Sequence, residues 1–103
     1  MPRLLIVDDE PMVLEVLRRL LVEPGRDVEV ASGPEEALEI AGRLEIDVAL
    51  VDKNLGDGSG LDVARALKRL KPDVEVILVT GYASLDTAIQ AVQIGAYDYV
   101  TKP

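Results

Sequence analysis

Five short apolar runs alternate with segments of helical periodicity, and this alternation constrains the fold more than any other feature of the chain. Apolar residues recur at helical spacing between the runs, as in Val13, Val16 and Leu17. Strands that alternate with helices form βαβ units, so we expect one domain with a mostly parallel sheet. The predicted strands are residues 3–7, 28–31, 46–51, 74–79 and 96–101.

Capping and breaking residues predict where the four helices begin and end. Proline is favoured in a first helical turn, small polar residues at the N-cap, and glycine just past the end. The segment 54–60 contains three glycines and is predicted to be a loop. The first helix should begin with an acid before Pro11 and end at Pro24-Gly25, and the second should begin at Ser32-Gly33-Pro34. Ser59 should cap a third helix over residues 61–70. The fourth should begin at Ser84 and end at Gly95.

Composition excludes several functions. The chain has 103 residues, with 19 acids against 11 bases and a net charge of −8, which argues against direct binding of nucleic acid. Cysteine and histidine are absent, which excludes disulfides, thiolate zinc sites and a Ser-His triad. Apolar runs reach only four residues, so we expect no membrane span and a cytoplasmic protein.

Polar residues follow or close four of the five predicted strands: Asp8 and Asp9, Asp52, Thr80 and Lys102. Ligands of open α/β sheets bind at the carboxyl ends of the strands, so these side chains should converge. Taken singly, each has a plainer explanation as a helix cap, a turn acid, a β-branched strand residue or a surface lysine. Their joint placement at matching strand ends instead favours a site for Mg²⁺ and a phosphoryl group.

The chemistry of such a site suggests a role for each group. Two carboxylates about 5 Å apart repel by roughly 3 kcal/mol at an effective dielectric near 20, so the acids need a shared cation. Mg²⁺ suits a few carboxylates, several waters and a phosphate oxygen. Asp52 stands alone on the central strand and is the predicted nucleophile, which would form an aspartyl phosphate. Lys102 and Thr80 would hold the phosphoryl oxygens.

At this point the chain resembles the receiver domain of two-component response regulators, the family that includes CheY. The resemblance implies a doubly wound, five-stranded parallel sheet of order 2-1-3-4-5, the flavodoxin/CheY-like fold. It covers essentially the whole chain. The matching stretches are Leu5-Ile6-Val7-Asp8-Asp9-Glu10, Val51-Asp52-Lys53-Asn54, Val79-Thr80-Gly81 and Tyr99-Val100-Thr101-Lys102-Pro103.

The resemblance implies a metal site around the phosphoacceptor. Asp52 matches the residue that accepts the phosphoryl group. Asp9, Asp52 and the backbone carbonyl of Asn54 match the Mg²⁺ ligands, and Asp8 would act from behind them or through a water. The implied phosphodonor is a sensor histidine kinase or a phosphotransfer protein.

The resemblance also implies a switch. Thr80 and Lys102 match the groups that hold the phosphoryl group, and Tyr99 matches the aromatic residue that rotates when Thr80 moves inward. The surface of the fourth helix and fifth strand would then change its contacts with an output domain or a partner protein. No conventional turnover is expected beyond the domain's own phosphorylation and slow dephosphorylation.

The chain departs from the family pattern at three places. Lys53 stands where many relatives carry an apolar residue, and Gly56 stands where proline is common, which should loosen the 54–60 loop. The third departure is that no fifth helix follows the fifth strand. We therefore expect residues 1–103 to be a receiver domain cut before its C-terminal helix, or a dimer or other subunit to cover that face. Tyr82 and Tyr97 receive no role.

Three other functions compete with this reading. A phosphatase of the haloacid dehalogenase type would need a second acid two residues after the nucleophile, where Asn54 stands. A flavin-binding flavodoxin would meet repulsion between its phosphate and Asp8-Asp9-Glu10. A receiver-like interaction module that is never phosphorylated stays open because of Lys53.

Overall fold

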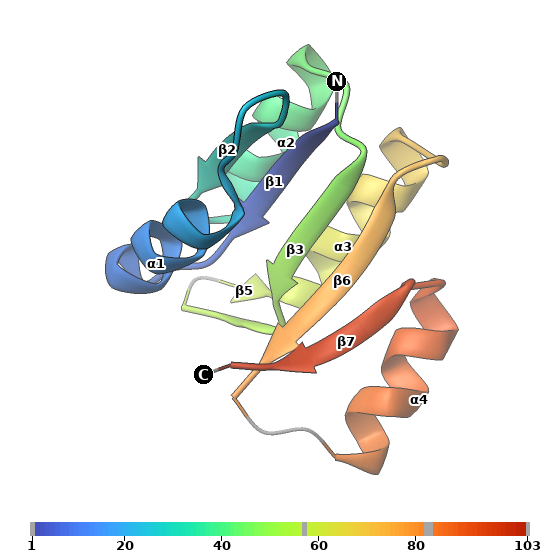
Figure 1. The fold of residues 1–103 in the computed structure, drawn as a ribbon. Coiled ribbons are helices and arrows are strands. Elements are labelled where there is room, and N and C mark those ends of the chain that lie inside the picture. Colours follow the sequence, from blue (N-terminus) through green and yellow to red (C-terminus); the bar gives the residue numbers. More distant parts are fainter. Residues whose placement is uncertain (1, 57, 82–83, 103) are drawn as a thin grey trace.

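The computed structural model describes residues 2–56, 58–81 and 84–102 and contains a five-stranded parallel sheet (Figure 1). The strand order is β2-β1-β3-β6-β7, which confirms the predicted order of 2-1-3-4-5 for the five main strands. Each predicted strand lies within two residues of its observed bounds. These are β1 (Arg3–Val7), β2 (Asp27–Ala31), β3 (Val48–Asp52), β6 (Glu75–Thr80) and β7 (Asp98–Thr101).

Four helices cover the sheet unequally: α1 (Pro11–Leu21), α2 (Pro34–Arg43), α3 (Gly60–Leu70) and α4 (Leu85–Ile94). In Figure 1, α1 lies in front of the sheet, whereas α2 and α3 lie behind it. Helix α3 packs between α2 and α4, and α4 also contacts the edge strand β7. This arrangement follows from right-handed crossovers between parallel strands.

Most of the predicted helix boundaries are confirmed by their caps. The Ser59 and Ser84 hydroxyls accept hydrogen bonds from the backbone N–H groups of Leu61 and Thr87. Gly95 ends α4 in the left-handed conformation, with φ of 73°.

The predicted acidic cap of α1 is wrong. Glu10 occupies the N-cap position before Pro11, but its carboxylate makes no capping hydrogen bond. That carboxylate lies 3.6 Å from the Lys102 ammonium instead, because a nearby cation is a stronger partner than a backbone N–H group.

The described part of the 54–60 segment contains more regular structure than predicted. Within it, β4 (Asn54–Leu55) and β5 (Gly58–Ser59) pair antiparallel, and α3 starts at Gly60. Leu55 is buried in the hydrophobic core, and this burial anchors the segment to the domain.

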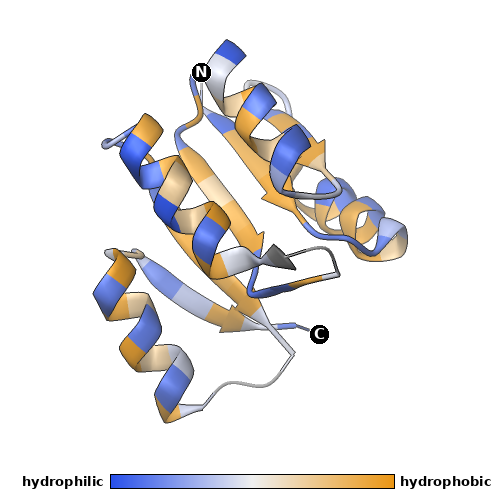
Figure 2. Ribbon diagram, turned by 180° about the vertical axis from the view of Figure 1, so that it is seen from behind, coloured by the Kyte–Doolittle hydropathy of each residue, from blue (hydrophilic) through white to orange (hydrophobic). Residues whose placement is uncertain are grey.

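The hydrophobic core lies between the sheet and the layer of α2, α3 and α4. Figure 2 shows the apolar central strands beneath these helices. Leu5 of β1 and Val51 of β3 are fully buried there, against Ile40 of α2 and Leu67 of α3. The core is aliphatic, since the chain has no Phe or Trp.

The opposite face, under α1, is thinly covered. We expected strand residues 48–51 to be buried on both faces, but Val48 and Leu50 are only half-buried because α1 alone packs on their side. Every residue of α1 keeps some exposure, and Met12 and Leu20 are 79% and 70% exposed. That a second copy or another subunit covers this face stays a prediction. None of the helices in the described part of the chain is long and apolar enough to cross a membrane.

Gly60 is the point where α3 approaches the end of β3 most closely. A Cβ atom added at Gly60 would overlap the backbone oxygen of Asp52, whereas one added at Gly42 would meet open space. We predict that Gly60→Ala lowers the free energy of unfolding by about 1–3 kcal/mol, the usual cost of overpacking. Gly42→Ala on the exposed side of α2 should raise it by about 0.5–1 kcal/mol. Urea unfolding followed by circular dichroism measures the free energy of unfolding of both variants. Equal effects would contradict the close approach of Gly60 to the Asp52 backbone.

Candidate functional site

The carboxyl ends of four neighbouring strands bring the predicted site residues to one edge of the sheet. Asp52 ends β3 and Thr80 ends β6, and both side chains are buried. Asp8 follows β1 directly and is only 1% exposed, while Lys102 follows β7. The parallel register pairs Val7 with Val51, so the acids after β1 and at the end of β3 are neighbours.

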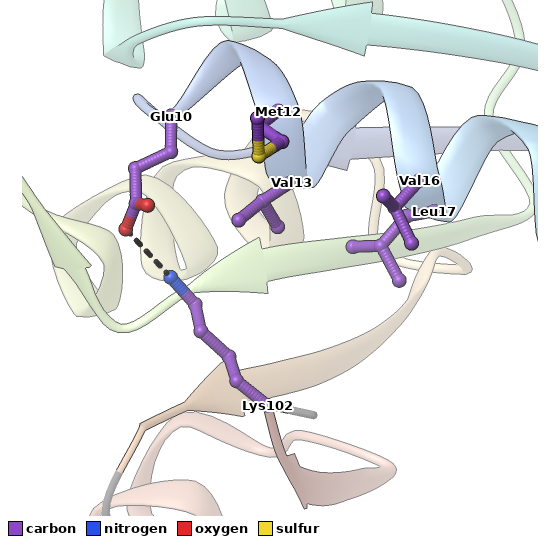
Figure 3. A pocket seen from close by; sticks show the side chains of 6 residues that line it. All are labelled: Glu10, Met12, Val13, Val16, Leu17 and Lys102. Carbon is purple, nitrogen blue, oxygen red and sulfur yellow. Dashed lines mark ion pairs between the residues drawn. The ribbon is translucent and has the colours of Figure 1, made fainter.

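Lys102 joins the two buried acids. Its Nζ atom lies 3.1 Å from Asp8 Oδ2 and 3.1 Å from Asp52 Oδ2. Glu10 Oε1 is a third contact at 3.6 Å (Figure 3). The lysine therefore reaches from beyond the edge strand β7, past β6, to the acids of β1 and β3.

Backbone N–H groups fix the orientation of both buried carboxylates. Asp8 Oδ1 accepts from the N–H of Glu10 at 2.9 Å, and Asp52 Oδ1 accepts from the N–H of Asn54 at 3.2 Å. In each case the other oxygen, Oδ2, faces Lys102. Both acids are thus held in one orientation by one turn of backbone and one shared cation.

Asp9 reaches across to the segment after β3. Its Oδ2 accepts a hydrogen bond of 2.7 Å from the N–H of Gly56, and a Cβ atom at Gly56 would lie 2.6 Å from that oxygen. Proline, which we noted as common at this position, has no N–H to donate. The N–H of Gly56 therefore binds Asp9, and the looser 54–60 loop stays a prediction.

Burial and neighbouring charges shift the pKa values of Asp52 and Lys102. Burial raises the pKa of Asp52 above its ordinary value, the neighbouring Asp8 adds to the rise, and hydrogen bonds from Lys102 and Asn54 oppose it. Burial alone would lower the pKa of Lys102, but its contacts with Asp52 and Asp8 outweigh this and raise it. Lys102 therefore stays cationic at neutral pH.

Three consecutive acids could hold a cation. Carboxylate oxygens of Asp8, Asp9 and Glu10 all lie within 4.8 Å of one another. Asp8 Oδ2 is buried, and no donor in the described part of the chain is aligned to form a hydrogen bond with it. Oxygen ligands and excess negative charge fit a hard divalent cation such as Mg²⁺. We assigned Glu10 only to capping, although its place directly after Asp8 and Asp9 could have indicated that the three acids lie together.

A shallow apolar hollow of about 240 Å³ opens beside the acids, between α1 and Lys102 (Figure 3). Val13, Val16 and Leu17 of α1 line it together with the Lys102 stem. Apolar neighbours on this side limit the water around the Lys102 ammonium and so strengthen its ion pairs.

The predicted switch residues lie on the two last strands. Thr80 is 1% exposed at the end of β6 and is register-paired with Thr101 of β7. Tyr99 of β7 is half-buried and packs against the hydrophobic core. Tyr97 is 72% exposed, in agreement with its having no assigned role, and Tyr82 lies outside the described residues.

Lys53 points away from the acids, toward α4. Its ammonium donates a hydrogen bond of 3.0 Å to the hydroxyl of Thr87. The sequence did not predict this contact, because the two residues lie far apart in the chain and no local pattern links them.

The comparisons with known proteins agree with this geometry. The family model of the response regulator receiver domain matches residues 4–103. The response regulator protein PilR of Pseudomonas aeruginosa is 44% identical over 99 residues, which cover 96% of this chain and 22% of PilR. The photosynthetic apparatus regulatory protein RegA of Rhodovulum sulfidophilum is 40% identical over 102 residues, 99% of this chain and 56% of RegA. The chain therefore spans only part of the length of these relatives.

Solved structures match the whole chain. A response regulator from Burkholderia pseudomallei, crystallised with a phosphorylated aspartic acid, calcium and citrate, superposes with a TM-score of 0.93 at 39% identity, over 100% of this chain and 61% of that one. The Thermotoga maritima response regulator TrrA, in complex with Mg²⁺ and BeF, gives 0.87 at 34% identity, over 100% and 88%. Sequence, fold and strand-end chemistry agree: this chain belongs to the response regulator receiver domain family of two-component signal transduction.

Proposed function

We propose that Asp52 accepts a phosphoryl group from a phosphohistidine of a sensor histidine kinase or phosphotransfer protein, and that the phosphorylated domain regulates an output domain or partner protein. The observation that carries the proposal is the buried Asp52 carboxylate, held by Lys102 at 3.1 Å beside the acids that follow β1. Partners of this kind act in the cytoplasm, where we place the domain.

The transfer needs a nucleophile and stabilisation of charge. A carboxylate oxygen of Asp52 forms a bond to phosphorus while the bond from phosphorus to the imidazole nitrogen of the donor breaks, and the electron pair stays on the imidazole. The Lys102 ammonium offsets negative charge on the phosphoryl oxygens, and Thr80 donates a hydrogen bond to one of them.

A divalent cation fits the acids beside Asp52. Asp9, Asp52 and the backbone carbonyl of Asn54 would hold it, with Asp8 and Glu10 close by. Bound there, Mg²⁺ would offset the charge of the phosphoryl oxygens during transfer. The calcium ion and the Mg²⁺–BeF complex of the two solved relatives support this assignment.

The switch acts through the last two strands. A phosphoryl group on Asp52 would draw Thr80 inward, and Tyr99 would repack into the space that Thr80 leaves. Such a change is a shift between two packings of the domain, biased by contacts that only one of them makes. The surface of α4 and β7 would then present different contacts to a partner.

We predict that acetyl phosphate with Mg²⁺ adds one phosphoryl group to this chain, because the site supplies the nucleophile and the charge stabilisation by itself. Intact-mass spectrometry measures the addition. Asp52→Asn should abolish it, whereas Asp73→Asn, an exposed turn acid before β6, should leave it unchanged. Undiminished labelling of the Asp52→Asn variant would refute the assignment of Asp52.

We also predict that Mg²⁺ stabilises the domain, since it binds the clustered acids of the folded state only. At about ten times its Kd, a ligand of this kind adds about 1.4 kcal/mol, which raises the Tm of a domain of this size by several degrees. Asp9→Asn should remove most of the shift, and Asp73→Asn should retain it. Differential scanning calorimetry measures these shifts, and an equal shift in Asp9→Asn would exclude Asp9 as a ligand.

A further inference from the structure

We propose that Lys53 is a positioning residue for helix α4: its hydrogen bond to Thr87 holds the first turn of α4 in the unphosphorylated packing and thereby slows phosphorylation of Asp52. The proposal rests on the proposed function for the phosphorylation step. The hold on α4 itself can be measured without that step.

The base of the Lys53 side chain is fixed. The Lys53 N–H donates to the carbonyl of Val79 at 2.8 Å, and the Lys53 carbonyl accepts from the N–H of Gly60 at 2.9 Å. Gly60 has no room for a Cβ atom against the Asp52 backbone. Residue 53 is therefore pinned between the end of β6 and the start of α3, directly after the phosphoacceptor.

The tip of the side chain meets the cap of α4. Lys53 Nζ lies 3.0 Å from Thr87 Oγ1, and the same oxygen lies 3.3 Å from Ser84 Oγ. Ser84 Oγ in turn accepts from the N–H of Thr87. The lysine thus binds the side-chain pair that starts the helix.

Helix α4 is anchored unevenly, which makes this contact important. Its C-terminal half buries Ala91 and Ile94 in the core, but in the N-terminal half Thr87 is the buried residue, and Leu85 is 77% exposed. The first turn is thus held by hydrogen bonds rather than by apolar burial. Segments held in this way open more easily than those with a buried apolar anchor.

The first turn of α4 comes shortly after β6 in the chain, and β6 ends at the phosphoacceptor site. Val79 is register-paired with Asp52, and Thr80 follows it and is separated from α4 by residues 81–84 only. A rearrangement of Thr80 around a phosphoryl group would be passed along the chain to the first turn of α4. A contact made in one of two packings biases the domain toward that packing, so the Lys53–Thr87 bond opposes the displacement.

Paired variants of this chain test the proposal. Thr87→Val removes the acceptor without changing charge, and Lys53→Met removes the donor. Each should speed labelling by acetyl phosphate about fivefold, the effect of losing one hydrogen bond of average strength. The double variant should be no faster than either single variant, and Lys53→Arg should keep the wild-type rate. Lys71→Met, which removes a cation paired with Glu45 away from the site, is the matched control and should change nothing.

Amide hydrogen exchange of the unphosphorylated protein provides the second measurement. The amides of Thr87 and Ala88, which bond to Ser84, should exchange faster in Thr87→Val and Lys53→Met, with α2 unchanged. Slower labelling of Lys53→Met with an unchanged rate for Thr87→Val would show a direct effect of charge on the phosphodonor and would overturn the proposal. Unchanged exchange would overturn it as well. An Asp52 that is never labelled would refute the proposed function and the coupling to it, while exchange would still decide whether Lys53 holds α4.

Discussion

The charge balance around Lys102 is the interaction on which the site depends. A single ammonium faces two buried carboxylates at 3.1 Å each and a third at 3.6 Å. Without it, Asp8 and Asp52 would be two like charges that are removed from water and repel each other. Breaking a buried ion pair by deleting one partner typically costs 3–5 kcal/mol. The parallel pairing of β7 with β6 brings Lys102 to these acids.

The same charge balance favours a divalent cation at this site and fits the phosphoryl transfer that we propose. Asp8, Asp9, Glu10 and Asp52 exceed the positive charge that Lys102 supplies, and burial already raises the pKa of Asp52. The ionised acids thus gain from a cation that the folded chain positions but does not contain in its own side chains. Under the proposed function, one metal would couple the stability of the domain to its phosphorylation.

The sequence predicted the parts of the structure that repeat local patterns. Helix caps at Ser59, Ser84 and Gly95 follow from residue type, and the convergence of Asp52 with Lys102 follows from parallel strands. The direction of the Glu10 side chain could not be predicted, because a capping position does not specify a rotamer when a cation competes for the carboxylate. The bond between Gly56 and Asp9 was missed for a related reason: the family pattern indicated a lost proline, whereas the structure uses the N–H that proline lacks.

Lys53 shows how a departure from a family pattern can acquire a structural role. An apolar residue at this position could pack against α4 but could not bind the hydroxyl of a buried Thr87. Apolar packing changes gradually as a helix slides, whereas a hydrogen bond is lost within about an ångström of displacement. With this bond, the first turn of α4 would occupy one of two distinct positions rather than a continuous range of positions. A link of this kind would set how strongly α4 resists movement, separately from the phosphoryl chemistry that we propose for Asp52, Thr80 and Lys102.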